Sequence, residues 1–209
     1  MQRELVYLAL GDSLTAGKGA PYESSFVRQY ARLAESSLGL PIVAENAGKS
    51  GATTADILQT IKTVDPVRAA AVRSDIITVT AGGNDLIRAA KTFFYDNDVR
   101  HLMSALKQFD RNMTHILETI SALKQGSGPY AVKVVGLYNP LPEFEEAIFW
   151  VNKFNEHLRS LHGGSVAVVD VYDLFLGKED DLLSDDRFHP NAEGYRLIAE
   201  RVHVSGLIR

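Results

Sequence analysis

Short apolar runs alternate along the chain with longer segments in which apolar side chains recur every three or four residues. The apolar runs are bounded by glycine or polar turns and predict β-strands within 4–10, 41–46, 74–85, 131–139 and 165–173. The helical spacing predicts amphipathic helices over 24–39, 53–64, 98–124, 143–163 and 191–203, with Gly39 ending the first of them. This alternation predicts an α/β fold in which helices cover both faces of a five-stranded parallel sheet.

The chain of 209 residues contains no linker, repeat or low-complexity block, so we expect one domain spanning 1–209. Its formal net charge of -4 does not favour binding of nucleic acid or of an anionic membrane through charge alone. The lack of cysteine excludes disulfide bonds, thiolate catalysis and zinc–cysteine sites. The apolar runs are too short for stable membrane insertion.

The N-terminal residues do not resemble a signal peptide, because their apolar run is short and no small-residue cleavage site follows it. We therefore expect a cytoplasmic location. A spore-associated protein and a secreted protein trimmed of its signal segment remain as alternatives.

Polar residues cluster directly after several of the predicted strands. These clusters are Gly11–Leu14, Asn46–Gly51 and Gly82–Asp85, and a fourth, Asp186–Pro190, follows the last strand in a polar loop. In an open parallel sheet, ligands bind beyond the carboxyl ends of the strands. The four clusters are therefore expected to meet at one edge of the sheet.

The residue types in these clusters suit acyl transfer. A serine hydroxyl such as that of Ser13 needs a base to take its proton, and a histidine such as His189 serves as that base near neutral pH. The histidine in turn needs a carboxylate to orient it. Asp186 and the adjacent Asp185 both qualify, and the three-residue spacing to His189 favours Asp186.

An oxyanion hole would complete such a site. The candidate donors are the backbone amides of Ser13 and Gly48 and the side-chain amide of Asn84. Asp12 and Asp85 each follow a glycine at a strand end, where a carboxylate accepts hydrogen bonds from loop amides. We expect these two residues to shape the site rather than to react.

The ordered set of Gly-Asp-Ser-Leu at 11–14, Gly48, Gly-x-Asn-Asp at 82–85 and Asp-x-x-His-Pro at 186–190 resembles the GDSL lipases and esterases, also called SGNH hydrolases. The resemblance covers about residues 11–194. It implies a flavodoxin-like three-layer α/β/α sandwich that needs no metal and no organic cofactor.

The resemblance also implies roles for individual residues. Ser13 would be the nucleophile, His189 the general base and Asp186 its orienting partner, and the oxyanion hole would consist of Ser13, Gly48 and Asn84. The protein would then be a monomeric serine esterase or lipase, similar to bacterial lipase/acylhydrolases. Its substrate would be a small-molecule ester or a lipid.

The substrate is less defined than the reaction. Residues expected to line its site are Lys49, Phe93, Phe94, Leu141 and Phe144, and the apolar ones favour fatty acyl esters. Alternatives are a small-ester or carbohydrate acetylesterase, an acyl-thioesterase, and a decayed hydrolase that acts only as a binding module. Phe149 and Trp150 are expected to pack into the core instead.

Two other motifs do not support a different function. Gly48-Lys49-Ser50 resembles the end of a phosphate-binding loop, but Val43 stands where that motif needs glycine. The acidic run 179–181 lacks the alternating pattern of a calcium loop. The remaining histidines lack metal-ligand spacing.

Overall fold

The computed structural model describes residues 4–206, and within them five parallel strands form one sheet in the order β2-β1-β3-β4-β5. The strands are β1 (Leu5–Gly11), β2 (Ile42–Gly48), β3 (Ile76–Thr80), β4 (Ala131–Val135) and β5 (Val166–Val169). The predicted α/β fold with a five-stranded parallel sheet is therefore confirmed.

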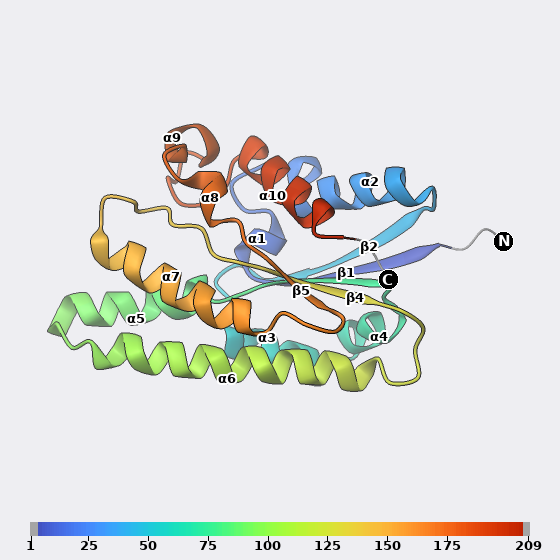
Figure 1. Cartoon of the computed structure of the whole chain (residues 1–209), viewed down its shortest axis with the longest axis horizontal. Coiled ribbons are helices and arrows are strands. Elements are labelled where there is room, and N and C mark those ends of the chain that lie inside the picture. Colours follow the sequence, from blue (N-terminus) through green and yellow to red (C-terminus); the bar gives the residue numbers. More distant parts are fainter. Residues whose placement is uncertain (1–3, 207–209) are drawn as a thin grey trace.

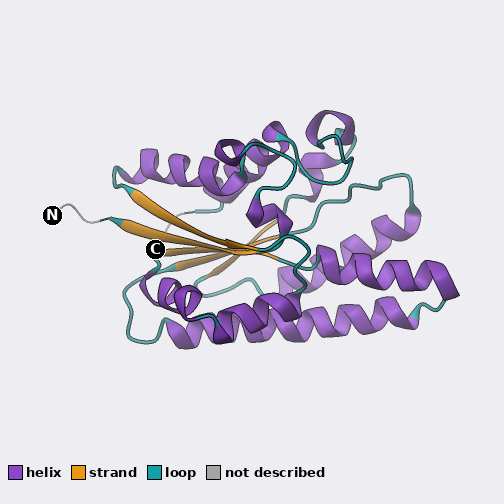
Figure 2. Ribbon diagram, turned by 180° about the vertical axis from the view of Figure 1, so that it is seen from behind, coloured by secondary structure: helices purple, strands orange, loops and turns teal. Residues whose placement is uncertain are grey.

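Helices cover both faces of this sheet, as Figures 1 and 2 show. One layer consists of α2 (Phe26–Leu38) and α10 (Ala192–Val204), with the short elements α1 (Ser13–Ala16), η1 (Tyr22–Ser24), α8 (Tyr172–Phe175) and α9 (Glu179–Leu182). The other layer consists of α3 (Thr54–Thr63), α4 (Asp65–Arg73), α5 (Gly83–Asp96), α6 (Arg100–Leu123) and α7 (Glu145–Ser160). The carboxyl ends of the strands lie toward the left in Figure 1.

The central strand β1 is apolar on both faces because both are buried. Tyr7 and Ala9 pack in the core beneath α2 and α10, whereas Leu8 and Leu10 pack against the layer of α3, α6 and α7. Burying one large apolar side chain stabilises a fold by about 1.5–3 kcal/mol. Because successive side chains of β1 point to opposite faces, this strand contributes to the apolar packing between the sheet and both helix layers.

Local capping explains where several helices begin and end. Gly39 adopts the left-handed conformation (φ 65°) and ends α2, as predicted. Thr53 and Asp56 form a capping box at the start of α3, and the Asn191 side chain accepts hydrogen bonds from two amides at the start of α10.

Two long helices were not predicted. α4 buries little beyond the small residues Ala70 and Ala71, so its hydrophobic pattern is weak. α5 follows two glycines that suggest a loop, and Ala89 is its one buried residue. Its apolar side chains at 86, 87, 90, 93 and 94 have helical spacing but face a cavity rather than the core.

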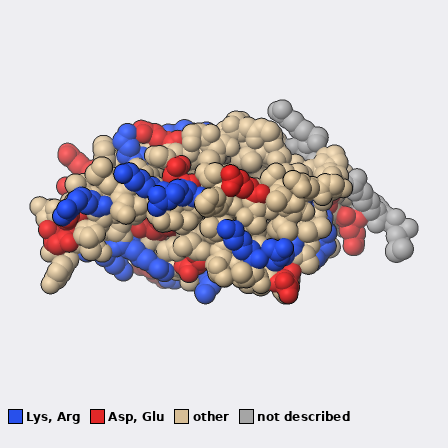
Figure 3. All heavy atoms as spheres, turned by 90° about the horizontal axis from the view of Figure 1, so that it is seen from below, with Lys and Arg blue, Asp and Glu red and all other residues tan. Residues whose placement is uncertain are grey.

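Charges of both signs are interspersed over the face formed by α3 and α6 (Figure 3). Lys133 of β4, by contrast, is almost fully buried, and its side chain ends among hydrogen-bond acceptors. Its Nζ donates hydrogen bonds to the Val202 and Gly206 carbonyls and to the Ser205 hydroxyl, all at the end of α10. Burial lowers the pKa of Lys133 from 10.5 to about 8.

We expect Lys133→Met to destabilise the protein by about 1–3 kcal/mol at pH 7, because it leaves buried carbonyls without a donor. Between pH 8 and pH 10.5 the unfolded chain binds more protons at Lys133 than the folded protein does. The stability advantage of the wild type should therefore grow as the pH rises through this window. Urea unfolding of both proteins measures it, with exposed Lys107→Met as control; a constant difference would contradict the assignment.

Candidate active site

Ser13 lies at the first turn of α1, directly after β1. The Asp12 carboxylate caps this turn by accepting hydrogen bonds from the Leu14 amide (3.0 Å) and the Thr80 hydroxyl (2.9 Å). Burial raises the pKa of Asp12, and these hydrogen bonds oppose that rise. As expected from the sequence, Asp12 shapes the turn that holds Ser13.

A continuous chain of hydrogen bonds joins three side chains from distant parts of the sequence. His189 Nε2 lies 3.0 Å from Ser13 Oγ, and His189 Nδ1 lies 2.7 Å from Asp186 Oδ2. Ser13 and His189 are both buried, being 9% and 8% exposed. This geometry suits transfer of the serine proton to histidine while the carboxylate orients the ring.

Asp186 is held in place by its own loop. Its Oδ1 accepts hydrogen bonds from the Ser184 hydroxyl and from the amides of Phe188 and His189. Partial desolvation raises the pKa of Asp186, but these bonds and the one to the His189 ring outweigh it and hold the pKa well below its usual range. The adjacent Asp185, left open by the sequence, makes none of these contacts.

Two hydrogen bonds to backbone carbonyls hold the loop that carries His189. The Ser184 amide donates to the His189 carbonyl (2.8 Å), and the Tyr138 hydroxyl donates to the Phe188 carbonyl (2.7 Å). Arg187 adopts a positive φ of 57°, which turns the chain between Asp186 and His189. Pro190 directly precedes Asn191, the N-cap of α10, and so lies before the helix.

Asn84 lies in the first turn of α5 and lines the same cavity as Ser13 and His189. Its side-chain amide donates one hydrogen bond to the Ala52 carbonyl (2.9 Å) and has a second N–H to offer. The Ser13 amide, at the start of α1, has no hydrogen-bond partner within residues 4–206. Two of the three expected donors are therefore available.

The structure does not support Gly48 as the third donor. Its amide donates to Asn46 Oδ1 (2.9 Å), and it is not among the residues that line the cavity. A side chain on Gly48 would meet the backbone of Thr15 and Ala16 at less than 3 Å. Glycine is thus needed here because α1 packs directly on the end of β2.

Gly51, which the sequence reasoning missed, has an amide that is free to donate, and like Gly48 it is not among the residues that line the cavity. Its φ of 81° favours glycine, and its amide has no hydrogen-bond partner in the described part of the chain. Arg88 donates to the Gly51 carbonyl (2.9 Å), next to the Ala52 carbonyl that Asn84 binds. The first turns of α5 therefore hold this loop at two consecutive carbonyls.

Asp85 also holds the α3 side of this loop. Its carboxylate accepts hydrogen bonds from the Thr54 amide (2.9 Å) and hydroxyl (2.6 Å), and Asn112 donates to that hydroxyl. Burial raises the pKa of Asp85, against the effect of these bonds. Its predicted structural role agrees with these contacts.

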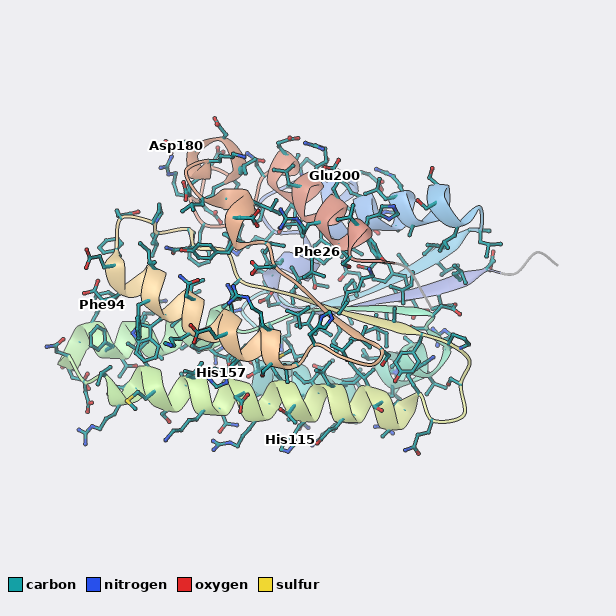
Figure 4. All side chains as sticks on the ribbon, viewed as in Figure 1. Phe26, Phe94, His115, His157, Asp180 and Glu200 are labelled. Atoms are coloured by element: carbon teal, nitrogen blue, oxygen red, sulfur yellow. The ribbon has the colours of Figure 1, made fainter. Side chains whose placement is uncertain are left out.

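A cavity of about 280 Å³ opens beside Ser13, Asn84 and His189. It lies between α5 and α7, and its wall is almost entirely apolar. The apolar lining consists of Leu14, Leu86, Ile87, Ala90, Phe93, Phe94, Leu102, Leu137, Tyr138, Pro140, Leu141, Phe144, Ala147, Trp150, Val151 and Phe188. Phe94, labelled in Figure 4, lies toward the left end of the molecule, near the end of α5.

Four of the five expected substrate-lining residues contribute to this cavity: Phe93, Phe94, Leu141 and Phe144. Lys49 does not, because it follows the edge strand β2 and is exposed on the far side of β1. The expectation that Phe149 and Trp150 fill the core was also wrong. Phe149 is 53% exposed, and Trp150 lines the cavity.

The comparisons with known proteins define the class. The profile of the GDSL-like lipase/acylhydrolase family matches residues 9–197, so the chain belongs to this family. Within residues 4–206, no group of three or more His, Asp and Glu side chains is arranged to hold a metal ion. No helix in that range is long and apolar enough to cross a membrane.

Two relatives are similar over nearly their whole length. The spore germination lipase LipC of Bacillus licheniformis is 35% identical over 206 residues, covering 97% of this chain and 96% of that protein. The crystal structure of the lipase Lip_vut3 from a goat rumen metagenome is also 35% identical, with a TM-score of 0.93 and coverage of 98% and 99%. The chain is therefore a carboxylic ester hydrolase of the GDSL type.

We expect Gly48→Ala to destabilise the protein by about 1–3 kcal/mol, because the new methyl group would push α1 away from β2. Thermal unfolding measures the effect. Gly128→Ala is the matched control, since a Cβ at that position meets nothing within 4 Å. Equal melting temperatures for the two variants would show that α1 does not pack on Gly48.

Proposed function

We propose that Ser13 is the nucleophile of this hydrolase, His189 its general base and Asp186 the carboxylate that orients the histidine. The observation that carries the proposal is the chain of hydrogen bonds from Asp186 through His189 to Ser13, at 2.7 and 3.0 Å, beside an apolar cavity. Ser13 Oγ attacks the ester carbonyl as His189 takes its proton. The resulting imidazolium protonates the leaving alcohol, and water activated by His189 then releases the acid.

We further propose that the oxyanion is bound by the Ser13 amide, the Gly51 amide and the free N–H of Asn84. All three belong to segments held by other hydrogen bonds: Asp12 caps the turn of Ser13, and Asn84 and Arg88 hold the loop of Gly51. Donors fixed before the substrate binds need no reorganisation in the transition state. One such donor contributes about 2.7–4 kcal/mol.

The cavity supports a medium-length acyl chain as the group transferred. Its α5 wall runs from Asn84 to Phe94, which at 1.5 Å per residue is about 15 Å. An extended chain advances about 1.2 Å per bond, by the dimensions of an extended backbone, so about twelve bonds fit along this wall. The polar lining residues are few beside sixteen apolar ones, and this favours a fatty acyl chain over a sugar.

Ser13→Ala should abolish hydrolysis of p-nitrophenyl esters without changing the melting temperature, because the nucleophile is lost and the fold is not. Asp186→Asn should lower kcat by at least about 10³-fold, since the histidine loses the carboxylate that orients it. Asp185→Asn is the matched control and should retain activity. If Asp185→Asn proves the more damaging, the orienting carboxylate is misassigned.

Across a ladder of p-nitrophenyl esters from acetyl to palmitoyl, kcat/KM should be highest near ten to twelve carbons. Ala90→Phe should move the optimum to about seven or eight, because a ring at Ala90 closes the cavity about 9 Å from Asn84. Lys91→Phe places the same ring outside the cavity and should leave the optimum unchanged. An acetyl optimum in the wild type would favour the small-ester or carbohydrate acetylesterase alternative.

The monomeric state, the single domain and the cytoplasmic location remain predictions. A role in spores is a proposal that similarity to a spore germination lipase supports. Acyl thioesters share the carbonyl chemistry of esters and should be assayed beside the series of p-nitrophenyl esters.

A further inference from the structure

The exposed large apolar side chains of this protein are concentrated on two segments, 94–103 and 141–149. In residues 4–206 there are fourteen such side chains, and eight of them lie on these two segments. Phe94 is 70% exposed, Tyr95 92%, Met103 49% and Phe149 53%. We call the exposed apolar side chains of these two segments the apolar rim. Exposed apolar side chains concentrated in this way indicate an interaction site.

The apolar rim is continuous with the acyl cavity. Phe94, Leu141 and Phe144 both line the cavity and are exposed at the surface. Phe94 lies near the end of α5, at the end of the molecule toward which the strands run (Figures 1 and 4). A substrate chain that leaves the cavity at this end therefore meets exposed apolar side chains.

The charges on the same two segments restrict the partner. Five carboxylates lie on them, at positions 96, 98, 143, 145 and 146, against a single guanidinium, that of Arg100. The guanidinium of Arg100 is paired with Asp98, and Asp96 is paired with His101. The rim thus has no surplus of positive charge to attract an anionic surface.

We propose that the apolar rim docks on the surface of an electrically neutral lipid aggregate. An acyl chain then passes from the aggregate into the cavity without crossing water. Side chains such as Tyr95 and Phe149 lie against the lipid, while the flanking carboxylates stay in water and disfavour anionic lipids. This inference rests on the proposed function, in which the cavity takes the acyl chain of an ester.

The test compares a rim double variant, Tyr95→Ser with Phe149→Ser, with a control double variant, Tyr22→Ser with Leu176→Ser. The control side chains are similarly exposed, at 63% and 58%, but lie on the layer of α2 and α10. Neither pair lines the cavity. Binding is measured by sedimentation with phosphatidylcholine vesicles that carry no added ester substrate. Activity is measured on monomeric p-nitrophenyl butyrate and on a long-chain ester carried in the vesicles.

We expect the rim variant to bind phosphatidylcholine vesicles at least tenfold more weakly than the wild type and to lose a similar factor on the vesicle-borne ester. Hydrolysis of monomeric butyrate should be unchanged in both variants, and the control variant should bind as the wild type does. Vesicles of phosphatidylglycerol should bind the wild type less than neutral vesicles do.

Equal vesicle binding by the rim and control variants would overturn the proposal, as would no binding by the wild type or a preference for phosphatidylglycerol. A wild-type dimer in analytical ultracentrifugation that the rim variant cannot form would also overturn it, because a second copy would then cover the rim. Loss of butyrate hydrolysis in Ser13→Ala tests the proposed function separately. Vesicle binding does not depend on that result.

Discussion

The parallel pairing of β1 with both β2 and β3 is the constraint on which the site depends. It places the end of β1, with Ser13 in the turn that follows, between the ends of two neighbouring strands. The Thr80 hydroxyl at the end of β3 can then bind Asp12, and Gly48 at the end of β2 lies directly against α1. If either neighbour shifted by one residue, the alternation of side chains would turn these groups to the wrong face.

The beginning of α5 connects the reacting groups to the cavity. Asn84 lines the cavity together with Ser13, Asp85 binds the start of α3, and Arg88 binds the Gly51 carbonyl. The same helix continues as the apolar wall that ends at Phe94. In the proposed function, this single rigid element sets the distance between the oxyanion donors and the far end of the acyl chain, so the geometry of the helix would determine the preferred chain length.

The polar groups at the site are buried but almost all are partnered. Burial raises the pKa values of Asp12 and Asp85. Hydrogen bonds from loop amides and hydroxyls to each carboxylate reduce this rise in pKa. Asp186 is more exposed, and its hydrogen bonds lower its pKa. The difference follows from burial: Asp12 and Asp85 lie in the interior of two turns, whereas the side chain of Asp186 is partly exposed and supports the buried ring of His189.

The sequence by itself determined the alternation of strands and helices, because burial on both faces of the sheet imposes visible periodicities. It also indicated Ser13, His189, Asn84 and Asp186 as candidate site residues through their places after strands or before α10. It selected Gly48 rather than Gly51 as an oxyanion donor, since which amide is free depends on the Asn46 side chain and on the packing of α1. It missed α5 because the glycines at its start suggest a loop, and it did not place Trp150 because a helix that lines a cavity has the same apolar spacing as one that fills a core. Tertiary structure decided these points, since contacts between segments far apart in the sequence determine which groups remain exposed to a substrate.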